Sequence, residues 1–137
     1  MSLTPTRPAA PALSVVVPVL NEATGITHTL AALAPLRTRG AEVLVVDGGS
    51  SDGTPFLAQP HADAVLAGPR GRARQMNAGA AIARGRVLLF LHADTELPPE
   101  ADSLLLGALA DNASSRHARG ASLWGRFDVN IVGRHPM

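Results

Sequence analysis

Three short clusters of polar residues hold the side chains of this chain that could do chemistry. They are Asn21-Glu22, the stretch from Asp47 to Asp52, and His92-Ala93-Asp94. Each cluster directly follows an apolar run that is typical of a buried strand. Ligands of parallel α/β sheets bind at the carboxyl ends of the strands, so the three clusters are predicted to surround one crevice.

The second cluster is an acidic, glycine-rich loop in which Asp47 and Asp52 flank glycines and serines. Glycine lets the backbone bend sharply, so both carboxylates could face one ligand; alternatively, they only cap a turn and the next helix. The loop lacks the G-x-G-x-x-G spacing of dinucleotide sites, and a chain without lysine has no Walker motif. A carboxylate here suits a base N–H, a ribose hydroxyl or a cation.

The third cluster places His92 and Asp94 on either side of one residue. In an extended strand end the two side chains point the same way, which suits a divalent cation. Mg²⁺ takes one or two carboxylates and completes its shell with water and phosphate oxygens, so Asp94 is the predicted ligand. His92 would bind a softer ion such as Mn²⁺ or hydrogen-bond a nucleotide. The alternative is that the pair only caps the loop before Pro98.

Arginines lie where a phosphate could bind, because Arg70, Arg72 and Arg74 stand at the start of a predicted helix, with Asn77 one turn further on. Guanidinium groups match phosphate oxygens, and a helix N-terminus adds positive potential. At most two of the three arginines can face one site, because residues i and i+2 diverge on a helix. The alternative is that these arginines lie on a solvated helix face, where arginine is also common.

The elements that must position these residues alternate between strand and helix. Strands are predicted at 13–17, 42–47, 64–67 and 87–91, with a fifth through Phe127 and Val129. Pro18 is expected to end the first strand, and Asn21 to cap a helix that ends before Gly40. Further helices are predicted at 54–60, at 72–83 with Ala73, Met76, Ala80 and Ala83 on its inner face, and after Pro98-Pro99 to about 112 with Leu104, Leu105, Ala108 and Leu109 inside.

This alternation predicts a Rossmann-like α/β domain, with a mostly parallel sheet and helices on both faces. The expected strand order is three, two, one, four, which would bring the polar clusters to one switch point.

Length and composition fit one globular domain with a modest core. The 137 residues are 46% hydrophobic and 17% charged, contain no cysteine and carry a net charge of +1, which gives no case for nucleic acid. Residues 1–12 are read as a loose leader without the apolar centre of a signal peptide, and 13–137 as the domain. A cytoplasmic protein is expected, with peripheral membrane association left open. The sequence stops at His135-Pro136-Met137, where a further segment is expected to begin, so we expect a truncated core.

Four motifs in this order resemble the nucleotide-binding half of family 2 glycosyltransferases. They are Val17-Pro18-Val19-Leu20-Asn21-Glu22, Val45 to Thr54, Arg72 to Gly79, and Leu91-His92-Ala93-Asp94. The block Arg74-Gln75-Met76-Asn77-Ala78-Gly79, combined with His-Ala-Asp in place of the family's Asp-x-Asp, resembles a bacterial subgroup of generic glycosyltransferases.

The resemblance implies a GT-A fold and a UDP- or GDP-sugar donor. Asp47 would accept a hydrogen bond from the base, and Asp94 would coordinate the Mn²⁺ or Mg²⁺ ion that bridges the diphosphate. Because His92 replaces the first acid of Asp-x-Asp, the contact which that acid usually makes is open. The nucleotide-binding candidates are Pro18, Val19, Asn21, Glu22, Asp47, Asp52, Arg72, Arg74, Asn77, His92 and Ala93.

The implied activity is metal-assisted transfer of a sugar, with inversion, to the hydroxyl of an unknown acceptor. A general base is needed, and in this family it lies in the acceptor half, expected beyond Met137. One alternative is a non-catalytic nucleotide-binding fragment, whose exposed apolar sheet edge would drive homo-oligomer formation. A nucleotidyltransferase ranks last, because Asn21-Glu22-Ala23 lacks the glycines and basic residues of such enzymes.

Overall fold

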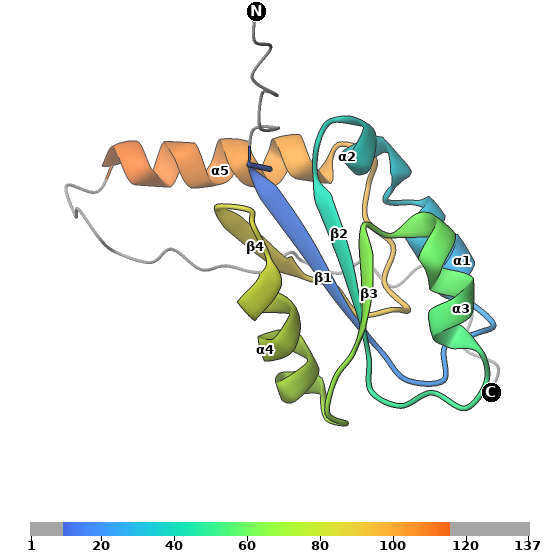
Figure 1. The fold of residues 1–137 in the computed structure, drawn as a ribbon. Coiled ribbons are helices and arrows are strands. Elements are labelled where there is room, and N and C mark those ends of the chain that lie inside the picture. Colours follow the sequence, from blue (N-terminus) through green and yellow to red (C-terminus); the bar gives the residue numbers. More distant parts are fainter. Residues whose placement is uncertain (1–9, 116–137) are drawn as a thin grey trace, which may run out of the picture.

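A single parallel sheet forms the centre of the computed structural model, which describes residues 10–115 (Figure 1). The strands are β1 (Leu13–Val19), β2 (Glu42–Asp47), β3 (Ala64–Ala67) and β4 (Val87–Phe90). Their order is β3-β2-β1-β4, which confirms the predicted order and the Rossmann-like fold class. The leader up to residue 9 and the strand predicted through Phe127 and Val129 lie outside the described residues.

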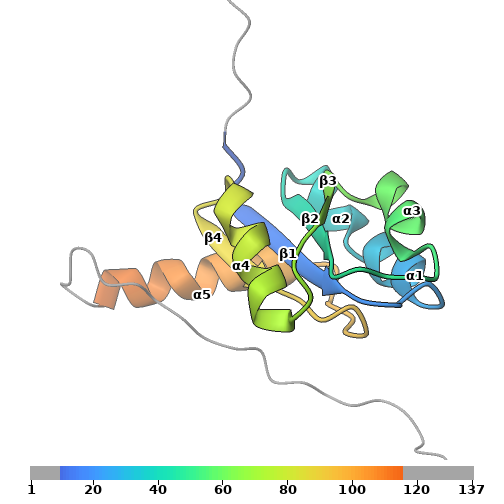
Figure 2. The same ribbon diagram turned by 60° about the horizontal axis from the view of Figure 1, so that its bottom comes forward.

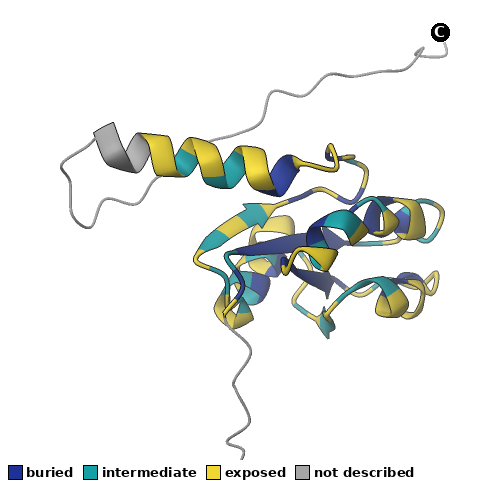
Figure 3. Ribbon diagram, turned by 90° about the horizontal axis from the view of Figure 1, so that it is seen from above, coloured by how far each residue is buried: buried dark blue, intermediate teal, exposed yellow. Residues whose placement is uncertain are grey.

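Helices cover both faces of the sheet, as the α/β pattern predicts (Figure 2). They are α1 (Ile26–Ala31), α2 (Ala34–Thr38), α3 (Thr54–Ala58), the 3₁₀ turn η1 (Gln59–His61), α4 (Arg72–Ile82) and α5 (Ala101–Ser115). The larger core cluster joins α1, α2, α3 and the start of α5 to one face, and a smaller cluster joins α4 to the other. The inner strands β1 and β2 are buried along their whole length (Figure 3).

The first strand runs two residues further than predicted, through Pro18 to Val19. Val16 O accepts a hydrogen bond from Leu91 N, so the backbone of Val16, and that of Pro18 two residues on, faces the side of β4. The strand β4 has already ended at Phe90. The missing N–H of Pro18 therefore costs the sheet no ladder hydrogen bond, and proline is tolerated there.

The helix predicted to start behind Asn21 is wrong in its start and its continuity. The first helix begins at Ile26 behind Gly25, and a second one, α2, follows after a break. Asn21 has a left-handed backbone (φ 52°) and does not cap a helix. Pro35, which lacks an N–H, falls in the first turn of α2, where helices tolerate proline best.

The inner faces of α4 and α5 also differ from the prediction. Gln75 and Gly79 are the buried residues of α4, whereas Ala73 is exposed. A Cβ at Gly79 would collide with the side chain of Val16, so this glycine sets the close approach of α4 to the sheet. On α5, Leu105 packs against the core as predicted, but Leu104 is 55% exposed.

Polar side chains close the amino end of the sheet. The carboxylate of Glu42 is buried and accepts hydrogen bonds from Ser14 Oγ at 2.9 Å, Arg84 N at 3.0 Å and Arg84 Nε at 2.8 Å. Nearby, Arg37 pairs with Asp63 at 3.1 Å. Within residues 10–115, no helix combines the length and apolar character needed to cross a membrane.

Candidate functional site

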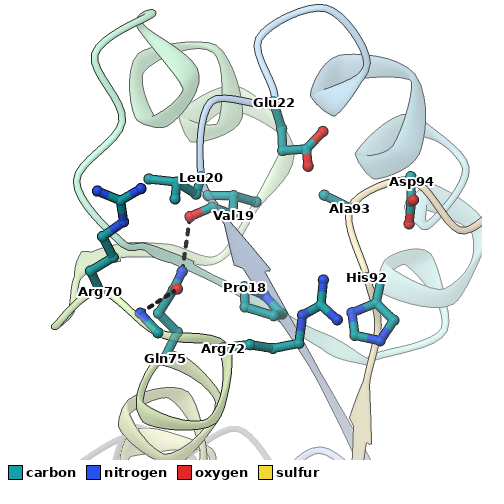
Figure 4. Close-up of a pocket in the computed structure, with 11 residues that line it drawn as sticks. Pro18, Val19, Leu20, Glu22, Arg70, Arg72, Gln75, His92, Ala93 and Asp94 are labelled. Carbon is teal, nitrogen blue, oxygen red and sulfur yellow. Dashed lines mark hydrogen bonds between the residues drawn. The ribbon is translucent and has the colours of Figure 1, made fainter.

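A cavity of about 360 Å³ opens at the carboxyl end of the sheet, between the ends of β1 and β4 and the start of α4 (Figure 4). It is lined by Pro18, Val19, Leu20, Glu22, Arg70, Gly71, Arg72, Gln75, His92, Ala93 and Asp94. The predicted convergence of strand ends on one crevice is therefore present for the first and third polar clusters.

The candidate residues from the sequence divide into two groups. Those that line the cavity are Pro18, Val19, Glu22, Arg72, His92, Ala93 and Asp94. Those that do not are Asn21, Asp47, Asp52, Arg74 and Asn77. The cavity adds Leu20, Gly71 and Gln75, and also Arg70, which the cation pattern had indicated.

The carboxylate of Asp47 turns into its own loop. Asp47 Oδ2 accepts from Gly49 N and Ser50 N, both at 3.0 Å, and Asp47 Oδ1 accepts from Ser50 Oγ at 2.5 Å. Only 6% of the residue is exposed. Asp47 thus stabilises the shape of the glycine loop beside the cavity, which is the role of a turn-forming Asp.

The loops after β1 and β2 are joined by reciprocal hydrogen bonds. Asn21 Oδ1 accepts from Ser51 N at 2.8 Å, and Asn21 N donates to Ser50 Oγ at 2.8 Å. Asp52 Oδ2 accepts from Ala23 N at 3.1 Å, and Asp52 Oδ1 accepts from the hydroxyl and amide of Thr54. The Thr54 hydroxyl is the main reason that the pKa of Asp52 lies below its ordinary value. Asn21 and Asp52 therefore fix the wall that carries Glu22.

The His92-Ala93-Asp94 segment presents two ligand-type side chains to the cavity. His92 and Asp94 are exposed, whereas Ala93 between them is buried. The Ala93 carbonyl accepts a 2.5 Å hydrogen bond from Thr29 Oγ1 of α1, which fixes the segment. Both flanking residues line the cavity, but they stand on a turn closed by the hydrogen bond from Thr95 N to His92 O at 3.0 Å, and not on the extended strand end that was predicted.

The donor set fits a hard divalent cation that a ligand helps to coordinate. Asp94 contributes a carboxylate to the cavity lining, and His92 contributes an imidazole, which suits a softer ion such as Mn²⁺. Among the described residues, no group of three or more His, Cys, Asp or Glu side chains is placed to enclose a metal. Mg²⁺ is usually held by one or two carboxylates plus water and phosphate, so an open site of this kind suits it.

Two arginines give the cavity its positive charge. Arg70 and Arg72 line it, whereas Arg74 lies outside the lining, which agrees with the expectation that at most two of the three face one site. In Figure 4 the two guanidinium groups stand on different sides of the cavity, and that of Arg72 lies on the side of His92. Arg74 and Asn77 are exposed on α4 and take no part in the lining.

Sequence reasoning missed Gln75 as an individual functional residue. It was visible only within the block from Arg74 to Gly79, because a lone glutamine on a helix carries no chemical signal. The structure buries it at the floor of the cavity, where its amide hydrogen-bonds Val19 O, Val46 O and Gly71 N.

Comparisons with solved structures place this fold among sugar transferases. Glucosyl-3-phosphoglycerate synthase from Mycobacterium tuberculosis, in complex with Mn²⁺, UDP and glucosyl-3-phosphoglycerate, is 25% identical with a TM-score of 0.63, over 74% of this chain and 40% of that one. A mannosyltransferase from Pyrobaculum calidifontis, in complex with GDP-Man and Mn²⁺, is 30% identical with a TM-score of 0.59, over 71% of this chain and 31% of that one.

A third similar structure, S. aureus TarS 1–349, shares the fold at 24% identity, with a TM-score of 0.62 over 81% of this chain and 38% of that one. The chain thus spans about 40% or less of the length of these three structures. A search of curated proteins found no match. The model of the family "Glycosyl transferase family 2" matches residues 14–120, which is most of the sequence, and the chain therefore belongs to this glycosyltransferase family.

Proposed function

We propose that this chain is the donor-binding part of an inverting glycosyltransferase that uses a UDP- or GDP-sugar and a divalent cation. The observation that carries the proposal is the cavity, which Arg70 and Arg72 line together with the His92-Ala93-Asp94 segment. A nucleotide diphosphate needs cationic groups for its phosphates and an apolar wall for its base. The cavity offers both, since Pro18, Val19 and Leu20 supply an apolar part of its wall.

The residues divide the work by chemistry. The arginines would bind phosphate oxygens, for which guanidinium forks are suited. Glu22 would accept a hydrogen bond from the base or ribose, since an ionised carboxylate only accepts. For Asp47 we propose that it acts on the base mainly through its loop, because the hydrogen bonds from Gly49 and Ser50 already use both of its oxygens.

Asp94 would hold the cation, with His92 as a second ligand or as a hydrogen-bond donor to the nucleotide. When bound, a Mn²⁺ or Mg²⁺ ion would neutralise charge on the leaving diphosphate. The hydrogen bond from Thr29 Oγ1 to the Ala93 carbonyl fixes the backbone between His92 and Asp94. Both of these residues line the cavity, where a cation could reach them.

The finer assignments are proposals that the family and the sequence support together. We place the chain in the bacterial subgroup with the Arg74-to-Gly79 block and His-Ala-Asp, in the cytoplasm, with peripheral membrane association left open. The acceptor is an unknown hydroxyl compound. Homo-oligomer formation stays a prediction; Leu88 and Phe90 of the edge strand β4, 39% and 44% exposed, would supply the apolar surface for it.

Calorimetry with UDP and GDP tests the proposal. We expect binding that strengthens when Mn²⁺ or Mg²⁺ is added, and that loses this metal response in Asp94→Asn. Glu96→Gln is the matched control, because it removes the same charge from an exposed residue of the same loop outside the cavity lining. Metal-independent binding by the unaltered chain, or an equal response in Asp94→Asn, would contradict the proposed metal role.

A second candidate function is nucleotide binding without sugar transfer. Among the described residues, Glu22, His92 and Asp94 are the side chains of the cavity lining that could accept a proton, and the proposal assigns all three to the donor and its cation. No side chain is then left there to act as the general base that transfer needs. Hydrolysis or transfer of sugar from the bound donor by this chain would exclude this second candidate.

A further inference from the structure

The side-chain amide of Gln75 joins three backbone segments at the carboxyl end of the sheet. Gln75 Nε2 donates to Val19 O at 2.8 Å and to Val46 O at 2.9 Å, at the ends of β1 and β2. Gln75 Oε1 accepts from Gly71 N at 3.3 Å, at the start of α4 (Figure 4). A primary amide has two N–H donors and one carbonyl acceptor, so one side chain serves three segments.

Burial makes these hydrogen bonds consequential. Gln75 is 4% exposed, so an unpaired partner left behind could not turn to bulk water. Gln75 N also donates to Gly71 O at 2.8 Å, so Gly71 is bonded to Gln75 through both its N–H and its C=O. Gly71, with φ 132°, is thereby held at the point where the chain enters α4.

Gly48 leaves the space that this amide occupies. A Cβ at Gly48 would lie 2.8 Å from Gln75 Cδ and from Gln75 Oε1, which is closer than packed atoms approach. Gly48 N in turn donates to Val19 O at 3.0 Å, the carbonyl that Gln75 also contacts. The glycine loop, the end of β1 and the start of α4 thus meet around a single amide group.

We propose that Gln75 is a positioning residue that sets the distance between the two sides of the nucleotide site. On one side it holds the backbone of Val19, next to Leu20 of the apolar wall, and on the other it holds Gly71, next to Arg70 and Arg72. A nucleoside diphosphate would contact both sides at once. This inference rests on the proposed function, and it assigns Gln75 no contact with the reacting atoms.

The test compares the affinity for UDP and GDP with thermal stability. Gln75→Met keeps the length of the side chain and its helix propensity but removes the donors and the carbonyl acceptor. We expect about tenfold weaker binding of the nucleotide. The backbone segments at Val19 and Gly71 would no longer be linked, although the side chains that line each of them stay in place. Ser14→Ala is the control for a merely structural effect. Ser14 is fully buried in β1, the strand whose carboxyl end Gln75 contacts, but Ser14 bonds Glu42 and Gly85 at the amino end of that strand.

A double-mutant cycle with Gly48 sharpens the test. Gly48→Ala should weaken nucleotide binding in the unaltered chain, because the new methyl group displaces the amide of Gln75. The same change should have little effect in Gln75→Ala, where the displaced group is gone. Coupling of this kind is expected for residues in contact and would not appear for independent sites.

The outcomes separate the inference from the function on which it rests. Weak binding in Gln75→Met, with Ser14→Ala binding normally, supports the inference. Binding within twofold of normal in Gln75→Met, or equal losses in Gln75→Met and Ser14→Ala at equal loss of melting temperature, overturns it and leaves the proposed function standing. If the unaltered chain binds neither UDP nor GDP with or without Mn²⁺, the proposed function fails and the inference fails with it.

Discussion

The two ends of the sheet use the same residue types in opposite ways. At the amino end, Glu42 and Asp63 are paired with arginines, and the buried Glu42 carboxylate is fully engaged. At the carboxyl end, Arg72 and Asp94 line a cavity, and no ion pair among the described residues involves either. Charges that are paired stabilise a fold, whereas charges held open at a cavity can meet a ligand.

The rigid parts of the carboxyl end explain how the open charges keep their places. There the side chains of Asp47, Asp52 and Thr29 bond backbone groups of the loops, and Gln75 bonds backbone carbonyls near the ends of β1 and β2. The charged side chains that line the cavity stand on these fixed loops. The comparison predicts that changes to the paired charges at the amino end lower stability and leave nucleotide binding intact. Changes to the open charges of the cavity lining should weaken nucleotide binding and leave stability nearly intact.

Gly85→Ala should give the largest loss of stability. A Cβ at Gly85 would lie 2.6 Å from the backbone N of Ser14 and 2.8 Å from the backbone C of Leu13, and backbone in a central strand cannot shift cheaply. We expect the free energy of unfolding to fall by about 1–3 kcal/mol, measured by urea denaturation. Nucleotide affinity below the transition should be unchanged; a parallel loss of affinity would contradict the division between the two ends.

Glu42→Gln should cost less, about 1–2 kcal/mol, because the amide keeps an acceptor but loses the charge-assisted bond to Arg84. The matched variant at the other end is Glu22→Gln, which lies at the cavity. Chemical denaturation should show the larger stability loss in Glu42→Gln, and calorimetry should show the larger loss of nucleotide affinity in Glu22→Gln. A stability loss in Glu22→Gln as large as that in Glu42→Gln would break the comparison.

The same carboxylate should make the amino end sensitive to acid. Burial alone would raise the pKa of Glu42, but hydrogen bonds from the backbone and guanidinium of Arg84 and from Ser14 lower it below its ordinary value of 4.5. A lowered folded pKa stabilises the fold in full above pH 4.5 and loses this contribution as the pH falls through the folded pKa. Below pH 4.5, the free energy of unfolding should therefore fall less steeply with falling pH in Glu42→Gln than in the unaltered chain, as urea denaturation at a series of pH values would measure.

Arg37→Ala should have the smallest effect. Its ion pair with Asp63 is partly exposed, with 31% and 39% of the two side chains accessible, and such pairs contribute about 0.2–1 kcal/mol. Asp63 Oδ2 keeps its 2.7 Å hydrogen bond from Val43 N after the change. A loss of unfolding free energy well above about 1 kcal/mol would show that this end is more tightly coupled than its contacts imply.

Much of the fold could be predicted because its strands are strongly apolar and its boundaries carry Gly, Pro or polar residues. The bounds of β2 were predicted to the residue, and the order of four strands followed from the α/β pattern. The segment after Asn21 was misjudged, since its capping residue serves a tertiary contact with Ser51 instead of a helix. The predicted inner face of α4 was right at Ala83, which packs against the core, but it missed Gln75. Polarity alone cannot show that Gln75 is buried by partners far away in the sequence.

The site was predictable where strand ends supplied the residues, as at Pro18, Val19 and Asp94. It was less predictable for Asp47, since a carboxylate after a strand can face a ligand or its own loop, and only the fold decides. Gln75 could not be predicted either, because its surroundings are also set only by the fold. Its role depends on the carbonyls of two strands and on a glycine that leaves it room, none of which is near it in sequence.

The most direct test of the account is to locate Mn²⁺ on the chain by NMR, since its unpaired electrons broaden the signals of nearby nuclei. With UDP or GDP present, the account predicts that trace Mn²⁺ broadens the amide signals of Ala93, Asp94 and Thr95, while those of Glu42, Asp63 and Gly85 stay sharp. Broadening centred on Glu42 and Asp63, or none at Asp94 in the presence of either nucleotide, would contradict it.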